Sequence, residues 1–537
     1  MDRFDFVIAG GGTAAGILAY RLAAAGKTVC VLEAGPADGN PLMRVPAGFI
    51  KTLFDPKVTW QLASEPSAHT NNRPIQYTQG KTLGGSSTIN GMVYNRGQAA
   101  DFDAWAQCGN AGWGYEDILP YFRRTERWAG TGDSRYRGGD GRLGTSRSSW
   151  PNAVVDAFVA SARELGHPFN PDYNGARQEG VGYYQSAIRR GRRVSTATAF
   201  LHPARRQFGV DIRTEAPVTG IVLEDGAATG IRYMRGGAVH LIAARKEIIV
   251  SAGTIGSPKL LQLSGIGPAA LLQRLGIAVR ADLAGVGENF RDHYSPRLVA
   301  RAKPRVDTLN AHVTGWPLAA EIAKWLAGRP SVLALSPALV HVFGKTDRAL
   351  DNPDYSLVFT PGSYKQGFIG RLDDFPGMTC GAWQMRPDSS GYVRIRSADP
   401  RDPPLANPNY LAVATDGRIL VGALKAARAI LTAPPLAPFV ETELFPGADV
   451  QSDDEWLAFA RQYGNSSYHL VGTCRMGPAS DPTAVVDERL RVRGVRGLRV
   501  VDASIMPTMP SANTYAATMM IAEKASDMIL ADHRAGL

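Results

Sequence analysis

Three glycines near the N-terminus have the spacing of a phosphate-binding turn. The run Gly10-Gly11-Gly12-Thr13-Ala14-Ala15 matches the pattern G-x-G-x-x-G/A, with alanine in place of the third glycine. Because glycine has no Cβ, it permits a tight turn and lets backbone N–H groups approach a pyrophosphate closely. Glu33 stands at the spacing of an acid that accepts hydrogen bonds from a ribose diol, which argues against a 2′-phosphate.

The residues around these glycines predict the β-α-β unit that would position them. Phe4 to Ala9 is a short apolar run, Ala14 to Ala25 has helical spacing, and Thr28 to Leu32 is a second apolar run. Together they predict a dinucleotide site in which the pyrophosphate lies at the helix N-terminus. Since the same unit serves both NAD and FAD, these residues alone leave the cofactor open.

The size and charge of the chain limit its architecture and its partners. A chain of 537 residues, 44% of them hydrophobic, exceeds one simple core, so we expect two domains or one large elaborated domain. The formal net charge is +10, but the basic residues are scattered, and Arg189 to Arg193 is the one local cluster. No nucleic-acid motif accompanies them, and we expect no nucleic-acid partner.

Cysteine spacing and hydropathy exclude other classes of protein. Cys30, Cys108, Cys380 and Cys474 lie far apart and lack the paired spacings of a zinc site or a redox dithiol, so no metal site is expected. No apolar stretch approaches transmembrane length, and the charged N-terminus runs directly into a strand-like segment without a secretory signal. These patterns predict a cytoplasmic protein without an integral membrane segment.

Segments spread along the chain resemble the glucose-methanol-choline (GMC) oxidoreductase family. Gly80 to Asn90 (GKTLGGSSTIN) resembles the first signature of this family, and Gly253 to Gly267 resembles the second. The resemblance covers nearly the whole chain, because it continues through Gly285 to Asn289, Asp292-His293, His469 to Gly477, and Asp502 to Asn513. It implies FAD rather than NAD, and it points to the branch of choline and sorbose dehydrogenases.

The resemblance implies an α/β fold, with a Rossmann-type FAD-binding domain interleaved with an α+β substrate domain built on an antiparallel sheet. Short β-rich segments and a helix-like stretch at about 210–287 predict a second α/β region, whereas Pro, Gly and aromatic residues in 130–200 and 310–460 predict strands and loops. The expected FAD-binding parts are residues 1–155, 206–310 and 463–537, and the expected substrate-domain parts are residues 156–205 and 311–462.

Several segments are expected to contact FAD. Gly84 to Ser87 are small enough for backbone N–H groups and hydroxyls to approach a phosphate or the flavin edge. By resemblance, Val218 is expected near the adenine, Asn90 to Val93 near the isoalloxazine, and Asp502 with Ala503 along the ribityl and pyrophosphate groups. The full expected set is Gly10, Gly12, Thr13, Ala14, Glu33, Ala34, Leu83, Gly84, Ser87, Asn90, Gly91, Met92, Val93, Val218, Ala252, Gly253, Asp502, Ala503, Asn513 and Thr514.

Attachment of the flavin is expected to be non-covalent. Some family members bind FAD covalently through a histidine of the first signature. The nearest equivalent here is Ile89, whose side chain cannot form that bond.

The resemblance makes His469 the expected catalytic base, although Leu470 replaces a proline common in that motif. Oxidising an alcohol requires a base near neutrality to take the hydroxyl proton while the α-hydrogen leaves as hydride toward flavin N5. His469 must start neutral, so activity should fall at acid pH. Asn513 begins an apolar helical run, where it fits an N-cap, and the resemblance also makes it the second catalytic residue, hydrogen-bonded to the substrate oxygen.

Several other residues are expected to support the site or the core without taking part in the reaction. His293 matches a family motif but is interpreted as structural, and Ser467 and Tyr468 are expected to shape the space beside the flavin. Phe359, Trp383 and Met385 lie in the segment expected to roof the flavin, yet such residues are also typical of sheet core. We interpret Met476, Met519 and Met520 as core.

The expected function is FAD-dependent oxidation of a primary alcohol to an aldehyde. The partners would be a small-molecule alcohol and an electron acceptor, which is either oxygen or a quinone- or dye-type compound. A hydroxynitrile lyase, which cleaves a cyanohydrin on the same scaffold without redox use of the flavin, remains an alternative, as does a flavin-carrying binding protein without turnover.

Overall fold

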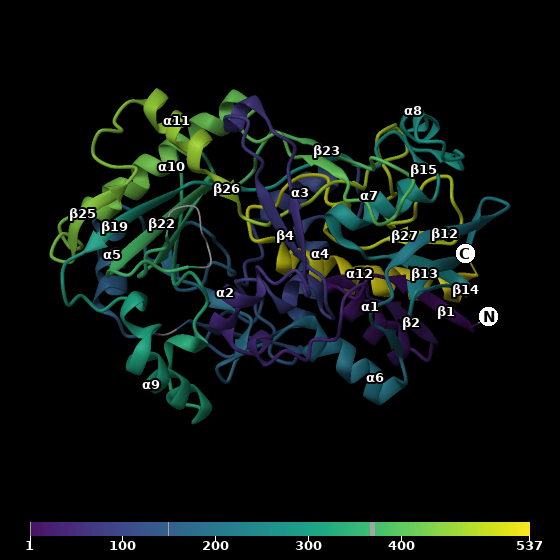
Figure 1. Cartoon of the computed structure of the whole chain (residues 1–537), viewed down its shortest axis with the longest axis horizontal. Helices are drawn as coiled ribbons and strands as arrows, with labels where there is room; N and C mark the ends of the chain where they lie inside the picture. Colours follow the sequence, from purple (N-terminus) through teal and green to yellow (C-terminus); the bar gives the residue numbers. More distant parts are fainter. Residues whose placement is uncertain (1, 149, 366–370, 537) are drawn as a thin grey trace.

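The computed structural model describes residues 2–148, 150–365 and 371–536 and contains two large sheets that lie side by side (Figure 1). The first sheet has seven strands in the order β11-β2-β1-β14-β13-β12, with β27 also paired to β14. Its strands are β1 (Asp2–Ala9), β2 (Val29–Leu32), β11 (Asp211–Arg213), β12 (Val218–Glu224), β13 (Ala227–Arg235), β14 (Ala238–Val250) and β27 (Leu498–Val500).

The predicted β-α-β unit forms the centre of this sheet. β1, β2, β11, β27 and the end of β14 run parallel, and α1 (Thr13–Ala24) connects β1 to β2. The helix packs against α12 (Thr514–Ala535), which is buried around most of its circumference. A helix buried on all sides lies inside a large core rather than on its surface, so α12 brings its N-terminus to the interior.

A charged group inside this core is paired. Glu523 of α12 is fully buried, and its carboxylate lies 2.8 Å from Nε of Arg21 on α1 and 2.7 Å from Nε of Arg124. Because a buried carboxylate is costly unless it is paired and hydrogen-bonded, these two arginines fix how α12 docks. Met476, Met519 and Met520 are buried in the same core, as predicted from the sequence.

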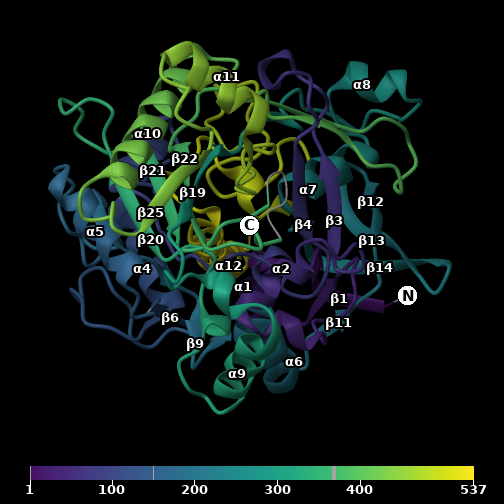
Figure 2. The ribbon, with the colours of Figure 1, turned by 60° about the vertical axis from the view of Figure 1, so that its left-hand side comes forward.

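The second sheet is antiparallel throughout, in the order β25-β19-β22-β21-β20-β7. Its strands are β7 (Gly180–Tyr183), β19 (Arg297–Ala302), β20 (Val340–Gly344), β21 (Tyr355–Thr360), β22 (Gly377–Gln384) and β25 (Val440–Phe445). Helices α5 (Ala153–Glu164), α10 (Ala414–Thr432) and α11 (Asp453–Tyr463) gather at this sheet, as Figure 2 shows, with α10 against β19, β21 and β22. The other face of the sheet is therefore free to line a site.

The expectation of strands and loops over 310–460 was incomplete. That stretch also contains α9 (Gly315–Leu326), α10 and α11. In α10, Leu420, Leu424 and Leu431 recur at helical spacing and are buried against the sheet, a pattern that the surrounding Pro- and Gly-rich composition obscured.

The order of the strands along the chain supports interleaved domains. Strands of the first sheet come from residues 2–32, 211–250 and 498–500, and strands of the second come from 180–183 and 297–445. We propose that the chain divides into FAD-binding and substrate-domain parts at the boundaries expected from the sequence, with one change. Because β19 already belongs to the antiparallel sheet, the third boundary lies near residue 296 instead of 310.

The described residues contain neither a helix that could span a membrane nor a cluster that could hold a metal ion. None of the helices there is long and apolar enough to cross a bilayer. Within the same residues, no three His, Cys, Asp or Glu side chains converge in a way that would hold a metal ion.

Candidate active site

One cavity of about 620 Å³ extends from the glycine turn after β1 to the free face of the antiparallel sheet. A volume in this range is typical of ligand and cofactor sites. Every residue predicted to bind FAD lines it except Leu83 and Gly84. Leu83 is instead buried in the core around β1 and α1. A Cβ on Gly84 would lie 2.4 Å from the Thr88 hydroxyl, so Gly84 packs closely within the loop that contains the first signature.

The glycine turn has the geometry of a phosphate cradle. Gly10 has a φ of +103°, and a Cβ there would lie 2.4 Å from the carbonyl oxygen of Ser251, so only glycine fits. Gly12 precedes α1, whose first turn has neither a side-chain cap nor an acidic residue. Gly12, Thr13 and Ala14 line the cavity at this helix start, and an anion bound there would satisfy the first N–H groups of the helix.

Glu33 lines the cavity at the end of β2, beside the glycine turn. Its carboxylate accepts hydrogen bonds from the N–H groups of Gly11 and Gly35, both at 2.8 Å. Burial raises the pKa of Glu33 to about 7, although both backbone N–H groups counteract that shift. The position at the end of β2 agrees with the acid predicted to hold a ribose diol.

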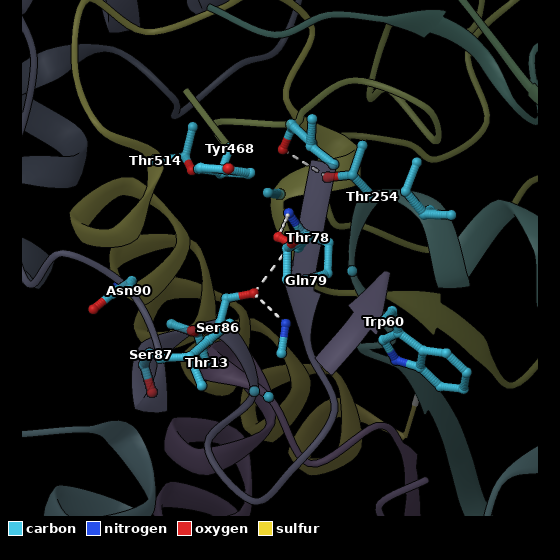
Figure 3. Close-up of a pocket in the computed structure, with 18 of the residues that line it drawn as sticks. Thr13, Trp60, Thr78, Gln79, Ser86, Ser87, Asn90, Thr254, Tyr468 and Thr514 are labelled. Atoms are coloured by element: carbon cyan, nitrogen blue, oxygen red, sulfur yellow. Dashed lines mark hydrogen bonds between the residues drawn. The ribbon is translucent and has the colours of Figure 1, made fainter. Parts of the chain in front are cut away.

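The loop of the first signature forms another wall. Ser86 Oγ accepts a hydrogen bond from Gly80 N at 3.0 Å and lies 3.1 Å from Gln79 Oε1; Figure 3 shows these bonds beside Thr13. Asn90 Oδ1 accepts hydrogen bonds from Met92 N and from the buried Arg193. Ser86 lies within the predicted range Gly84 to Ser87, although it was not among the individually expected contacts, and it lines the cavity. Gln79 also lines the cavity and was not predicted.

Asp502 fastens the end of β27 to the start of α7 (Gly253–Leu263). Its carboxylate accepts hydrogen bonds from Gly253 N at 2.9 Å, Ser257 Oγ at 2.6 Å and Ser504 N at 2.8 Å. Burial raises its pKa, and these donors oppose the shift. Since its carboxylate already accepts three hydrogen bonds from this chain, Asp502 shapes the cavity wall by holding the backbone of Gly253 and Ser504 in place.

His469 and Asn513 meet at the other end of the cavity. Asn513 Nδ2 lies 2.8 Å from His469 Nε2, and Asn513 Oδ1 has no hydrogen-bond partner among the described residues. Asn513 occupies the N-cap position of α12 but makes no side-chain cap bond there. Of the two roles predicted for this residue, the geometry therefore favours the catalytic one over capping.

The chain places His293 directly behind His469. β18 (Tyr294–Ser295) pairs antiparallel with β26 (Asn465–Ser466), which brings the residues flanking these short strands together. As a result, His293 Nδ1 lies 2.9 Å from His469 Nδ1, and His293 Nε2 lies 2.8 Å from the carbonyl oxygen of Met385. His293 was interpreted from the sequence as structural, and this contact with the predicted base was not anticipated.

These distances determine where the protons lie. A carbonyl oxygen can only accept, so His293 Nε2 carries the hydrogen and, in a neutral ring, its Nδ1 is an acceptor. His469 must then donate from Nδ1, which leaves Nε2 of His469 unprotonated. The amide of Asn513 donates to that nitrogen. This assignment follows from the partners, and it leaves Nε2 of His469 as an acceptor whose lone pair is held by the Asn513 amide until another donor replaces it.

Burial keeps both imidazoles neutral. It lowers the pKa of His469 well below its ordinary value, with a smaller contribution from His293, and it lowers the pKa of His293 to about 4. The backbone N–H of His469 donates to Asp292 Oδ1 at 2.8 Å, while Ser466 and Tyr410 donate to Oδ2. Asp292 thus holds the backbone of the histidine, and burial raises its own pKa to about 6.

The antiparallel sheet forms the wall opposite the glycine turn. The Trp383 ring lies 5.8 Å from that of His469, and Ser467 and Tyr468 also line the cavity. Phe359 instead stacks on Phe158 at 4.0 Å, and Met385 is fully buried. Of the three residues expected to roof a flavin, only Trp383 therefore lines the cavity. Phe359 alternates with the cavity-lining Val358 and Thr360 and faces the other side of the sheet, whereas Met385 lies beyond the end of β22.

Known proteins similar to this chain cover nearly all of its length. The family model described as GMC oxidoreductase matches residues 4–295 with its N-terminal part and 387–522 with its C-terminal part. An alcohol dehydrogenase [acceptor] of Pseudomonas putida is 39% identical over 530 residues, which are 98% of this chain and 96% of that protein. An oxygen-dependent choline dehydrogenase of Rhizobium johnstonii is 40% identical over 98% of this chain and 95% of its own.

The solved structures that resemble this one include pyridoxine 4-oxidase from Mesorbium loti. The two superpose with a TM-score of 0.88 at 29% sequence identity, over 97% of this chain and 98% of the other. The interleaved α/β architecture expected from the sequence is confirmed by this agreement.

Proposed function

This chain belongs to the GMC oxidoreductase family, and from that premise we propose that it oxidises a primary alcohol to an aldehyde with FAD as cofactor. Its curated relatives are named as alcohol and choline dehydrogenases and support FAD-dependent oxidation of CH–OH donors. The acceptor that reoxidises the flavin is proposed to be oxygen or a quinone- or dye-type compound.

The observation that carries the proposal is the pairing of His469 Nε2 with Asn513 Nδ2 at the wall of the cavity, where the partners of His469 assign Nε2 as the unprotonated nitrogen. A substrate hydroxyl placed between the two side chains would donate to Nε2 of His469 and accept from Nδ2 of Asn513, replacing their direct 2.8 Å bond. His469 then takes the hydroxyl proton, and its Nδ1–H remains bonded to His293 throughout. Bound FAD would accept the hydride that leaves the same carbon.

The cavity fits FAD in three respects. The uncapped start of α1 offers N–H groups to a pyrophosphate, and Glu33 stands at the ribose end with Val218 beside the proposed adenine position. The start of α12, with Asn513 and Thr514, faces the same cavity, where its positive end would stabilise negative charge on a reduced flavin.

We propose that FAD is bound without a covalent link. Ile89 lines the cavity at the position nearest to the attachment residue of some relatives, and its side chain has no nucleophilic atom. Release of intact FAD on acid precipitation would support this, and flavin that stays with the precipitate would contradict it.

Anaerobic mixing of the holoenzyme with a panel of primary alcohols tests the proposed reaction. We expect at least one alcohol to bleach the oxidised flavin band and to yield the aldehyde in equal amount. Release of cyanide from cyanohydrins without bleaching would instead identify a lyase, and no response to any alcohol would refute the proposal.

A further inference from the structure

The substrate end of the cavity carries one unusual charge. The free face of the antiparallel sheet presents mostly small or uncharged side chains to the cavity, namely Val358, Thr360, Thr379, Gly381 and Trp383, and Ser295 of the neighbouring β18 also lines it. Arg297, at the start of β19, lines the same face. It alternates with Leu298 and Ala300, which are buried on the helix-covered side, so the register of the strand directs Arg297 toward the cavity.

Although the backbone of Arg297 belongs to the β19–β22 ladder, its side chain makes no ion pair and no hydrogen bond with any residue that the structure describes. The two carboxylates that line the cavity, Glu33 and Asp502, lie at its nucleotide side and are bonded to backbone N–H groups. The structure does not describe Met1, Ser149, residues 366–370 (QGFIG) and Leu537. None of these residues is an aspartate or glutamate, so none has a carboxylate side chain that could pair with Arg297.

The positive charge of Arg297 acts on two tyrosines that line the cavity. Burial raises the pKa of Tyr468 and of Tyr364, and in both cases the positive charge of Arg297 opposes that rise. Both tyrosines line the cavity, and Tyr468 directly precedes His469. The guanidinium is therefore close enough to act on groups beside the proposed base.

The register of the sheet places Arg297 at a useful distance from the reacting end. Its strand partner is Gly381, where a Cβ would contact the Arg297 stem at 3.7 Å. Gly381 lies two residues, roughly 7 Å along β22, from Trp383, whose ring is beside that of His469. Arg297 and His469 therefore flank neighbouring positions of β22 on the wall of one cavity, where a substrate of a few carbons would contact both.

We propose that the substrate is an alcohol that carries a carboxylate, and that Arg297 binds this carboxylate while His469 takes the hydroxyl proton. A planar guanidinium binds a carboxylate through two parallel hydrogen bonds, which supplies the counter-ion missing from this half-buried site. A quaternary ammonium such as choline would instead be repelled by the positive charge of Arg297. We therefore expect choline to be a poor substrate, although relatives of this chain are named choline dehydrogenases. This inference rests on the proposed alcohol oxidation.

The test compares three substrate classes in anaerobic flavin reduction by the holoenzyme: ω-hydroxycarboxylates of three to six carbons, 1-alkanols of the same lengths, and choline. We expect the best hydroxycarboxylate to have a kcat/KM at least tenfold above its matched alkanol and above choline. Equal or better use of choline, or of the alkanols, by the unaltered protein would overturn the inference.

Substitution of Arg297 tests the residue itself. In Arg297→Gln, we expect the ratio of kcat/KM for the hydroxycarboxylate to that for the alkanol to fall by about 30-fold or more, as when one partner of a buried charge pair is removed. Arg301→Gln is the matched control, because Arg301 lies on the same strand but stands over Phe375 and does not line the cavity. An unchanged ratio in Arg297→Gln would overturn the assignment.

A binding experiment separates this inference from the proposed reaction. Butyrate, which has no hydroxyl to oxidise, should perturb the absorbance of the oxidised flavin, with a Kd at least tenfold weaker in Arg297→Gln than in Arg301→Gln. If no alcohol bleaches the flavin but butyrate binds through Arg297, the reaction is wrong and the anion site stands. If alcohols bleach the flavin and butyrate binds equally to both variants, the anion site is wrong.

Discussion

Replacing His293 tests whether a second histidine sets the proton position of the proposed base. In His293→Phe, the Nδ1–H of His469 loses the acceptor that lies 2.9 Å away, in a fully buried place. An unsatisfied buried donor costs about 1–3 kcal/mol. The ring of His469 can avoid this cost by moving its proton to Nε2, where it would block acceptance of the substrate proton.

The expected effect on catalysis follows from that energy. A cost of about 1–3 kcal/mol in holding the reactive tautomer corresponds to a roughly 5- to 150-fold loss in the rate of flavin reduction. The rate is measured by anaerobic stopped flow at saturating substrate, so that a change in KM does not contribute. His293→Gln, whose amide oxygen can accept from Nδ1, should recover part of the loss, which a purely structural role would not explain.

A control and the pH profile complete this test. His341 is another fully buried histidine of the antiparallel sheet that does not line the cavity, so His341→Phe should leave the rate unchanged. Because His293 contributes to the lowered pKa of His469, its replacement by glutamine should raise the pH at which activity is lost on acidification. Wild-type rate and pH profile in His293→Phe would refute the reasoning.

Two further substitutions test the ends of the cavity. Burial raises the pKa of Glu33 from 4.5 to about 7, so the folded state loses up to about 3 kcal/mol of stability as the pH rises from 4.5 to 7, where the unfolded chain gives up this proton and the folded chain keeps it. In urea unfolding, the FAD-free Glu33→Gln variant should therefore gain stability relative to the FAD-free parent between pH 5 and pH 8. An equal difference at both pH values would contradict this. The same variant should bind FAD more weakly in equilibrium titration, since it loses the anionic acceptor for the ribose. Asn513→Ala should lower kcat by about 10- to 100-fold, because the substrate oxygen loses one hydrogen-bond donor. Its thermal stability should stay close to that of the parent, because Asn513 makes no cap bond. A large loss of stability with full activity would show that capping is the main role of Asn513.

The nucleotide half of the fold was predictable because its signals are local. The glycine turn, the helix that follows and the acid at Glu33 lie within 30 residues, and each obeys a rule of backbone geometry. The structure places β1, α1 and β2 within two residues of the predicted bounds at every end. Local rules therefore sufficed for this half of the molecule.

The contacts that orient the reactive groups were not predictable from local pattern. His293 meets His469 across 176 residues, through the pairing of two very short strands. Likewise, a strand pattern shows that Arg297 and Leu298 face opposite sides but not which side a helix covers. Only the packing of α10 decides that Arg297 faces the cavity.

The rate of flavin reduction in His469→Ala tests the central claim most directly. With FAD bound to the same extent as in the parent, we expect the rate with the best alcohol to fall by about two to four orders of magnitude, as when a general base is removed. The parent should show its rate rising with pH to a plateau as the histidine loses its proton, and the variant should lack that ionisation. Parental rate and pH dependence in the variant would show that another group takes the proton.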